Sequence, residues 1–223
     1  MPGTTTAFPT SLKAEMMQGV HILAAQVTPT GNTHSNQVVD TLSSIAGIVA
    51  GMAIAASGIT AGTVASRCTG AAALQIDLAA SSTLVGTALT LSGDICKVAL
   101  VKAAPTGTYD GTTTNYSTLT GNADEVTGTG YSAGGFAWTA AQLTGIATTG
   151  TVAFGQFTVS ASWVSASFTA IGSLSYNTAN RLANVANRAL VVNDFGGSQT
   201  VTAGSFTETL PANDSTHALL RVG

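Results

Sequence analysis

The segment Ile95–Gly135 constrains the fold of this chain more than any other stretch. It begins with an apolar run, Ile95–Lys102, and continues through a long stretch of threonine, glycine and asparagine. Alternate residues of an extended chain point to opposite faces, which places Cys96, Val98 and Leu100 on one face of the run. The threonines that follow are stiff at χ1, and the glycines among them disfavour a helix. The segment therefore predicts a strand followed by turns, as in an all-β protein.

Turn residues recur along the rest of the chain and separate short runs with the composition of strands. Short strands at such regular spacing are typical of a sandwich or barrel. The predicted fold class is mainly β: a β-sandwich or barrel-like domain with an N-terminal helix and a small inserted β module. Besides the strand in 95–102, the predicted strands are 51–54, 57–64, 73–78, 87–91, 136–140, 151–159, 162–174, 188–194, 205–210 and 217–222.

Thr10–Ala25 is the one segment with a clear helical pattern. Ser11 is placed to cap this helix, and Glu15 favours its first turns. Its apolar residues recur at spacings of three and four, as expected of one buried face: Leu12, Met16, Val20 and Leu23. Residues 26–36 contain Pro, Gly and Asn, and we expect a loop there. Asn177–Asn187 fits either a loop or one or two turns of helix.

Three parts are predicted along the chain: an N-terminal arm and helix (1–37), a small inserted β module (38–92) and a main β-sandwich domain (93–223). The most apolar stretch, Ile45–Ile59, lies in the module. It is too short to span a bilayer and lacks flanking Lys or Arg, so we expect it in a core and expect no membrane partner. The first ten residues show no basic region followed by an apolar run, so no export signal is expected.

Charged residues make up only 8 % of the chain, against about 25 % in an average globular protein. The net charge is −3, and no Lys or Arg lies between Lys102 and Arg181. A basic surface that follows a nucleic-acid backbone is therefore not expected. A surface with so few charges favours burial in an assembly, which indicates a homo-oligomer such as a trimer.

One sequence match suggests catalysis. Gly130–Gly134 fits the G-x-S-x-G nucleophile elbow around Ser132, and Asp194 and His217 follow in the chain order of a hydrolase triad. The elbow requires a buried strand before the serine and a helix after it, whereas glycines flank Ser132 on both sides and no helical pattern follows. A glycine-rich turn is the favoured interpretation. No catalytic residue and no cofactor are predicted, and a serine esterase is kept as a remote alternative.

Metal binding is also not predicted. The histidines His21, His34 and His217 are far apart and lack the spacing of zinc ligands. Cys68 and Cys96 are too few for a disulfide framework. Cys96 falls on the apolar face of its strand, where a buried free thiol is expected.

Each remaining polar candidate has a structural interpretation. Asp110–Asn115 is rich in oxygen but poor in carboxylates, which favours an Asp-Gly turn over a calcium loop. Asp124 and Glu125 are adjacent, so in a strand they point to opposite faces and do not form a paired acid. Arg181 and Arg188 fit solvated edge charges, or partners of acids on a neighbouring subunit. An aromatic group fits either a sugar-stacking platform or, as favoured, the core of a sheet: Tyr131, Phe136 and Trp138.

Residues 50–66 and 84–93 read AGMAIAASGITAGTVAS and LVGTALTLSG. This pair resembles a small β module that recurs in phage structural proteins, with the form V-G-M-A-V-S-G-x-G-I-P-A-G-T followed by T-G-x-x-L-T-L. Thr60 stands where the module commonly has proline. Gly62, in A-G-T, fits a tight turn that needs positive φ.

A second set of motifs spans most of the chain. In order, they are Ser11-Leu-Lys13 with Gly19-Val-His21, Cys96-Lys-Val-Ala-Leu-Val101, Thr114-Asn-Tyr116, Asp124-Glu-Val-Thr-Gly-Thr-Gly-Tyr-Ser-Ala-Gly-Gly135, Asn187-Arg-Ala-Leu-Val-Val-Asn-Asp-Phe-Gly-Gly197 and Ala218-Leu-Leu-Arg-Val222. The set resembles a family of virion structural proteins encoded by many tailed bacteriophages. The chain departs from the family pattern at Cys96 and Val101, which replace an aromatic pair, and in the inserted module.

The resemblance implies a structural component of a tailed-phage virion, assembled in the host cytoplasm and not an enzyme. Its implied partners are the major capsid protein or other virion proteins. A capsid decoration or cement protein of the head is favoured. The alternative is a fibre, spike or tail-associated component, in which the module or the loops around residues 109–116 present a host-binding surface.

Overall fold

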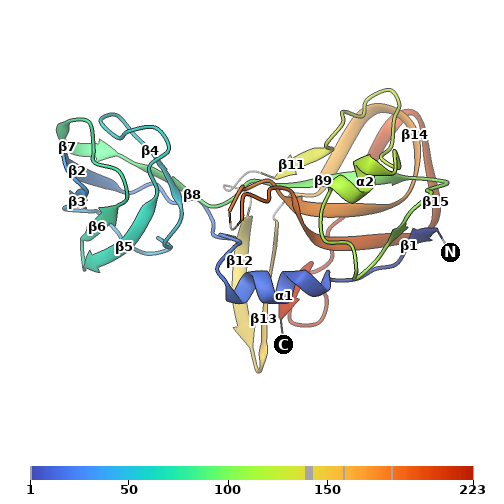
Figure 1. Cartoon of the computed structure of the whole chain (residues 1–223), viewed down its shortest axis with the longest axis horizontal. Coiled ribbons are helices and arrows are strands. Elements are labelled where there is room, and N and C mark those ends of the chain that lie inside the picture. The colour runs from blue at the N-terminus through green and yellow to red at the C-terminus, as the bar shows by residue number, and fades with distance from the viewer. Residues whose placement is uncertain (1, 139–142, 158, 182, 223) are drawn as a thin grey trace. The chain divides into compact units, whose positions relative to one another are not determined.

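The computed structural model describes residues 2–138, 143–157, 159–181 and 183–222, and it confirms a mainly β protein (Figure 1). The chain forms two compact units. The main unit comprises Met1–His21, Ile95–Thr139 and Gly145–Gly223. The inserted unit comprises Ile22–Asp94 and Ala140–Thr144. The expected module thus begins at Ile22, earlier than the predicted boundary at residue 38.

A four-stranded antiparallel sheet organises the main unit (Figure 1). Its order is β11 (Phe136–Trp138), β9 (Cys96–Lys102), β14 (Ala161–Asn177) and β15 (Arg188–Glu208). The predicted strand in 95–102 is therefore confirmed as β9. Its residues from Val98 to Val101 are all buried, because both faces of this central strand are covered.

The two strands predicted at 188–194 and 205–210 are one long strand, β15. A turn was predicted between them, and Gly196 and Gly197 do have positive φ values of 72° and 146°, which glycine adopts readily in turns. Pairing with β14 nevertheless resumes beyond them: Asp194 pairs with Gly172 and Gln199 with Ala170. The break is therefore an irregularity within the β14–β15 ribbon, and the chain stays in the sheet.

Smaller sheets complete the main unit. β12 (Leu143–Thr149), which was not predicted, joins β13 (Val152–Phe157) and β16 (Leu220–Val222) in a three-stranded sheet. β1 (Gly3–Thr4) pairs in parallel with β10 (Thr108–Tyr109). None of the sheets in the described ranges closes into a barrel.

The N-terminal helix is confirmed but shorter than predicted: α1 spans Thr10–Met17. The chain turns away at Gly19, whose φ is 65°. Ser11 does not cap the helix, because the N-cap residue is Pro9 and makes no side-chain capping bond. Met16 is 41 % exposed, so the expected apolar stripe is only partly buried. A second short helix, α2 (Ser117–Gly121), was not predicted.

The inserted unit holds a five-stranded sheet and a two-stranded pair. The sheet order is β5 (Ala65–Gly70), β6 (Ala73–Ile76), β3 (Val38–Asp40), β2 (Thr30–His34) and β7 (Thr83–Ala88), and the pair is β4 (Ala53–Ala55) with β8 (Thr90–Ser92). The loop predicted over 26–36 was therefore wrong, since β2 lies inside the sheet. Leu42 packs closely over Gly31 in this strand, since a Cβ on Gly31 would lie 2.8 Å from Leu42 Cδ2.

The Ile22–Asp94 segment, which forms most of the inserted unit, begins and ends at residues that bond to each other. Asp94 N–H donates to Ile22 O, and Ile22 N–H donates to Asp94 Oδ2, both at 2.9 Å. Gly93 makes this approach possible, because a Cβ there would lie 2.4 Å from Ile22 O. The two ends of the inserted unit are thus held together by buried hydrogen bonds.

The apolar stretch Ile45–Ile59 lies in the inserted unit, and its inward residues belong to a core, as predicted: Met52 and Ile54 are buried, and Ile45, Ile48 and Ile59 pack against them. No helix in the described part of the chain is long and apolar enough to cross a membrane. Gly62 has φ of 88°, which confirms the expected positive value at the A-G-T turn.

Candidate functional site

The elbow serine lies in a turn, and its triad partners have other contacts. Gly135 N–H donates to Ser132 O at 2.9 Å, which closes a glycine-rich turn. Asp194 Oδ1 accepts from Thr4 Oγ1 at 2.9 Å, and His217 Nδ1 lies 3.0 Å from Asp214 Oδ2. Among the described residues, no hydrogen bond joins Ser132, Asp194 or His217 to one another. The structure therefore does not assemble the triad that the sequence match suggested.

Glu125 is surrounded by hydroxyl and amide donors from the Ile95–Gly135 segment. Tyr116 Oη donates to its Oε2 at 2.6 Å, while Tyr131 Oη and Gly134 N–H each donate to its Oε1 at 2.7 Å. Tyr176, on β14, stacks on Tyr116 with ring centroids 4.4 Å apart and donates to Gly134 O at 2.8 Å. Burial, followed by the nearby Glu125 charge, raises the pKa of Tyr131 well above its usual range. Tyr116 and Tyr131 thus remain neutral and donate hydrogen bonds to the side chain of Glu125.

The glycines of this segment are needed where it crosses β9. A Cβ on Gly135, at φ of 72°, would lie 1.8 Å from Val98 O, and one on Gly128 would lie 2.3 Å from Ser167 O. Tyr131 Oη also accepts a hydrogen bond from Leu100 N–H at 3.0 Å. The glycines of the motif therefore allow its backbone to pack closely against β9 and β14.

Asp124 holds a different part of the chain, as its predicted opposite orientation to Glu125 implies. Its side chain is buried and accepts hydrogen bonds from Thr106 N–H, Gly107 N–H and Tyr109 Oη, at 2.9, 2.8 and 2.7 Å. Lys102 Nζ lies 3.0 Å from its Oδ1. Burial alone would raise the pKa of Asp124, but the hydrogen bonds outweigh it and hold that pKa far below its ordinary value. The carboxylate fixes the 103–109 turn.

A third cluster joins α1 to the β14–β15 end of the sheet. Glu15 is buried and its two oxygens lie 2.9 Å from His21 Nε2 and 2.8 Å from Arg188 Nη1. Asn177, at the end of β14, bonds His21 Nδ1 at 2.9 Å. Arg188 was predicted as a solvated edge charge or a partner of an acid on another subunit; the first interpretation is wrong, because Arg188 is mostly buried and pairs with Glu15 of the same chain.

Glu208, the last residue of β15, is a buried carboxyl group. Its side chain is held at Oε1 by Ser173 Oγ (2.6 Å) and Asn193 Nδ2 (3.2 Å). Its Oε2 is buried and makes no hydrogen bond to any described residue. Burial raises the pKa of Glu208, and the two hydrogen bonds only partly oppose this. The group therefore keeps its proton up to a higher pH than an ordinary glutamate does.

The other candidates have structural roles. Asp110 Oδ1 accepts from Thr112 N–H at 2.7 Å, which confirms the Asp-Gly turn. Trp138 is buried and stacks on Phe157 with centroids 4.1 Å apart, so it belongs to the core. His34 pairs with Asp40 at 3.0 Å. In the described ranges, no group of three or more His, Cys, Asp or Glu residues is placed so that it could hold a metal ion.

Both cysteines are free, with Cys96 buried, as predicted, and Cys68 exposed. In the 177–187 segment no helix is found among the described residues, and Arg181 forms a backbone bridge with Val185.

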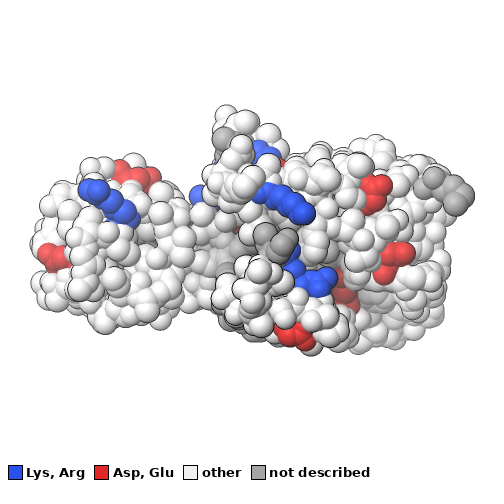
Figure 2. Space-filling model, turned by 90° about the horizontal axis from the view of Figure 1, so that it is seen from below, with Lys and Arg blue, Asp and Glu red and all other residues white. Residues whose placement is uncertain are grey.

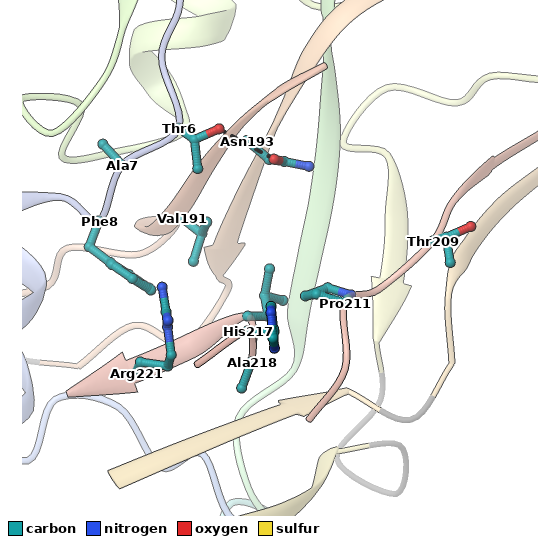
Figure 3. A pocket seen from close by; sticks show the side chains of 11 residues that line it. Thr6, Ala7, Phe8, Val191, Asn193, Thr209, Pro211, His217, Ala218 and Arg221 are labelled. Atoms are coloured by element: carbon teal, nitrogen blue, oxygen red, sulfur yellow. Dashed lines mark hydrogen bonds between the residues drawn. The ribbon is translucent and has the colours of Figure 1, made fainter. Parts of the chain in front are cut away.

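A pocket of about 490 Å³ lies in the main unit (Figure 3). It is bordered by the segment before α1, the first half of β15 and the C-terminal segment. Its lining residues are Thr6, Ala7, Phe8, Val191, Asn193, Thr209, Pro211, His217, Ala218, Leu219 and Arg221. A second, shallower pocket of about 330 Å³ shares Asn193 and Thr209 and reaches Phe206 and Glu208. No motif predicted either pocket, although the lining residues Val191, Asn193 and Arg221 lie in the last two resembling motifs.

Charges are sparse on the surface as well as in the composition. Figure 2 shows a face covered almost entirely by uncharged residues, with isolated Lys, Arg, Asp and Glu side chains. Single apolar side chains are exposed at separate positions of the chain, including Met17 at 85 %, Val85 at 84 % and Val164 at 67 %. Scattered exposure of this kind does not by itself mark a binding patch.

Comparison with protein-family models, with curated proteins and with solved structures gave no match to this chain.

Proposed function

We propose that this chain is a structural component of a tailed-phage virion, and that it decorates or cements the head shell. One observation carries the proposal: the residues of the resembling motifs make internal contacts that build the main unit. Tyr131 and Gly134 both donate hydrogen bonds to Glu125, and His21 and Arg188 meet at Glu15. Motif residues that serve as internal supports favour a framework, as a structural protein requires, over a reaction centre.

The surface supports the same role. A cement protein must bind across the seams between shell subunits, and the cores of protein interfaces contain few charged residues. With 8 % charged residues, most of the surface can be buried without desolvating an ion. We extend the proposal to a homo-oligomer such as a trimer. A stable monomer at micromolar concentration in sedimentation velocity would contradict that extension.

A fibre, spike or tail-associated component is the second candidate, because of one feature of the inserted unit. Strand β5 lies at an edge of its sheet, and its residues from Ser66 to Gly70 are all exposed. An exposed strand edge can pair with another chain or present a host-binding surface. This surface lies on the unit that distinguishes the chain from the family it resembles.

Imaging of virions by electron cryomicroscopy separates these candidates. Density for this fold on the head, at a copy number proportional to that of the major capsid protein, is expected for decoration. A few copies confined to the tail would favour the fibre instead, and absence from purified virions would refute both. Hydrolysis of an ester substrate that is lost in Ser132→Ala would revive the esterase.

A further inference from the structure

The 490 Å³ pocket carries a positive charge that its lining does not oppose. Arg221, on β16, makes no ion pair with any described residue and is exposed. In Figure 3 its side chain points from β16 toward Phe8. The eleven lining residues include no Asp or Glu. A free guanidinium at a pocket wall is suited to bind a carboxylate through two parallel hydrogen bonds.

The acids nearest to this pocket in the chain are already engaged. Asp214 is paired with His217, and Asp194 accepts from Thr4 and from Gly196 N–H. Glu208 accepts a hydrogen bond from the lining residue Asn193. None of these acids forms an ion pair with Arg221, so the guanidinium is open to an incoming carboxylate.

The rest of the pocket is apolar enough to hold a side chain. Phe8 and Val191 line it from the N-terminal segment and β15, and the C-terminal segment adds Pro211, Ala218 and Leu219. Its volume lies within the roughly 300–1,000 Å³ range of ligand pockets. The threonines Thr6 and Thr209 complete the lining, and the Thr6 hydroxyl accepts a hydrogen bond from Asp194 N–H at 2.9 Å.

From this charge complementarity we propose that the pocket docks an acidic peptide segment of a partner protein. The segment places one carboxylate on Arg221 and an adjacent apolar side chain against Phe8 and Leu219. Docking of such a peptide does not depend on the virion role, since it is measured on the isolated chain. If the virion role holds, the partner is a virion protein that presents an apolar residue beside an acid.

The test uses the full-length chain labelled with ¹⁵N and two probes, acetyl-Leu-Asp-amide and acetyl-Leu-Asn-amide. They have nearly the same shape and differ in charge. In amide NMR titrations, the Asp probe should shift the signals of Phe8, Ala218 and Arg221 and bind at least tenfold more tightly than the Asn probe. Arg221→Met should remove this difference. Arg67→Met, in the inserted unit where Arg67 donates to Gln75, should leave it unchanged.

A measurement on the unaltered chain keeps the test decisive if Arg221→Met fails to fold. Raising NaCl from low concentration to 0.5 M should weaken the Asp probe severalfold and leave the Asn probe nearly unchanged, because the exposed ion pair is screened. Equal binding of both probes, or binding with no salt dependence, overturns the proposal. Binding of hexanoate at Arg221 without binding of the Asp probe also overturns it, since the site would then take free carboxylic acids.

Discussion

Replacing Glu208 by Gln should change how the stability of the main unit depends on pH. Glu208 is 8 % exposed, and its Oε2 makes no hydrogen bond to any described residue. Burial raises its pKa above the ordinary value of 4.5. Between the pKa of the unfolded chain and that of the folded chain, the folded state holds a proton that the unfolded state has released. Stability contributed by this group is therefore fully present below about pH 4.5 and is lost as the pH rises through the folded pKa.

The size of the effect follows from the single proton involved. One proton retained on folding changes the free energy of unfolding by at most about 1.4 kcal/mol per pH unit. In Glu208→Gln this slope is absent. The variant should therefore gain stability relative to the unaltered chain by up to that amount per pH unit, starting above about pH 4.5. A constant offset between the two proteins is expected too, because the added NH₂ group replaces a buried oxygen that had no partner.

Urea unfolding followed by tryptophan fluorescence measures this difference in the right unit. The chain has two tryptophans, Trp138 and Trp163, and both lie in the main unit with Glu208. The assay is run at several pH values from 4 to 8. Asp110→Asn is the control: hydrogen bonds from Thr112 lower the pKa of Asp110, so its stabilising effect is lost only as the pH falls toward 3.8 and below. A free-energy difference for Glu208→Gln that is flat with pH, or that shrinks as pH rises, would refute the reasoning.

Three further substitutions test the clusters that build the main unit. Tyr131→Phe removes a donor to a carboxylate and an acceptor for a β9 amide, and should cost about 1.5–3 kcal/mol in urea unfolding. Gly135→Ala should give no soluble folded protein, because its Cβ would lie 1.8 Å from a carbonyl oxygen of β9; Gly121→Ala, whose Cβ meets nothing within 4 Å, should stay within about 0.5 kcal/mol. Arg188→Met should cost about 3–5 kcal/mol by leaving a buried carboxylate without its guanidinium, and adding Glu15→Gln should recover part of that loss. Wild-type stability in Arg188→Met would show that the ion pair is dispensable.

The local sequence pattern predicted those elements whose conformation depends mainly on neighbouring residues in the chain. The alternation and apolar content of 95–102 predicted β9, and the Asp-Gly pair predicted the turn at Asp110. Strand β2 escaped prediction because its sequence, TGNTH, has the composition of a loop. It forms a strand because β3 and β7 pair with it on both sides, and such tertiary pairing outweighs weak intrinsic preference.

The clusters could not be predicted because sequence spacing does not reveal which distant residues meet. Glu15 and Arg188 are 173 positions apart. Each looked like an ordinary charge, one in a helix and one at a strand end. In a chain with so few charges, however, a lone acid in an apolar strand is a usable signal. Glu208 stood at the end of the predicted strand 205–210 and could have been singled out on that ground.

The joined ends of the inserted unit have a consequence for how such proteins diversify. Ile22 and Asp94 bond to each other across a gap that Gly93 keeps narrow. For the main unit, the Ile22–Asp94 segment is therefore a connection between His21 and Ile95 whose two ends lie close together. Recombination can exchange this segment for one of another length or sequence, and the remaining fold needs no new spacing to accept it.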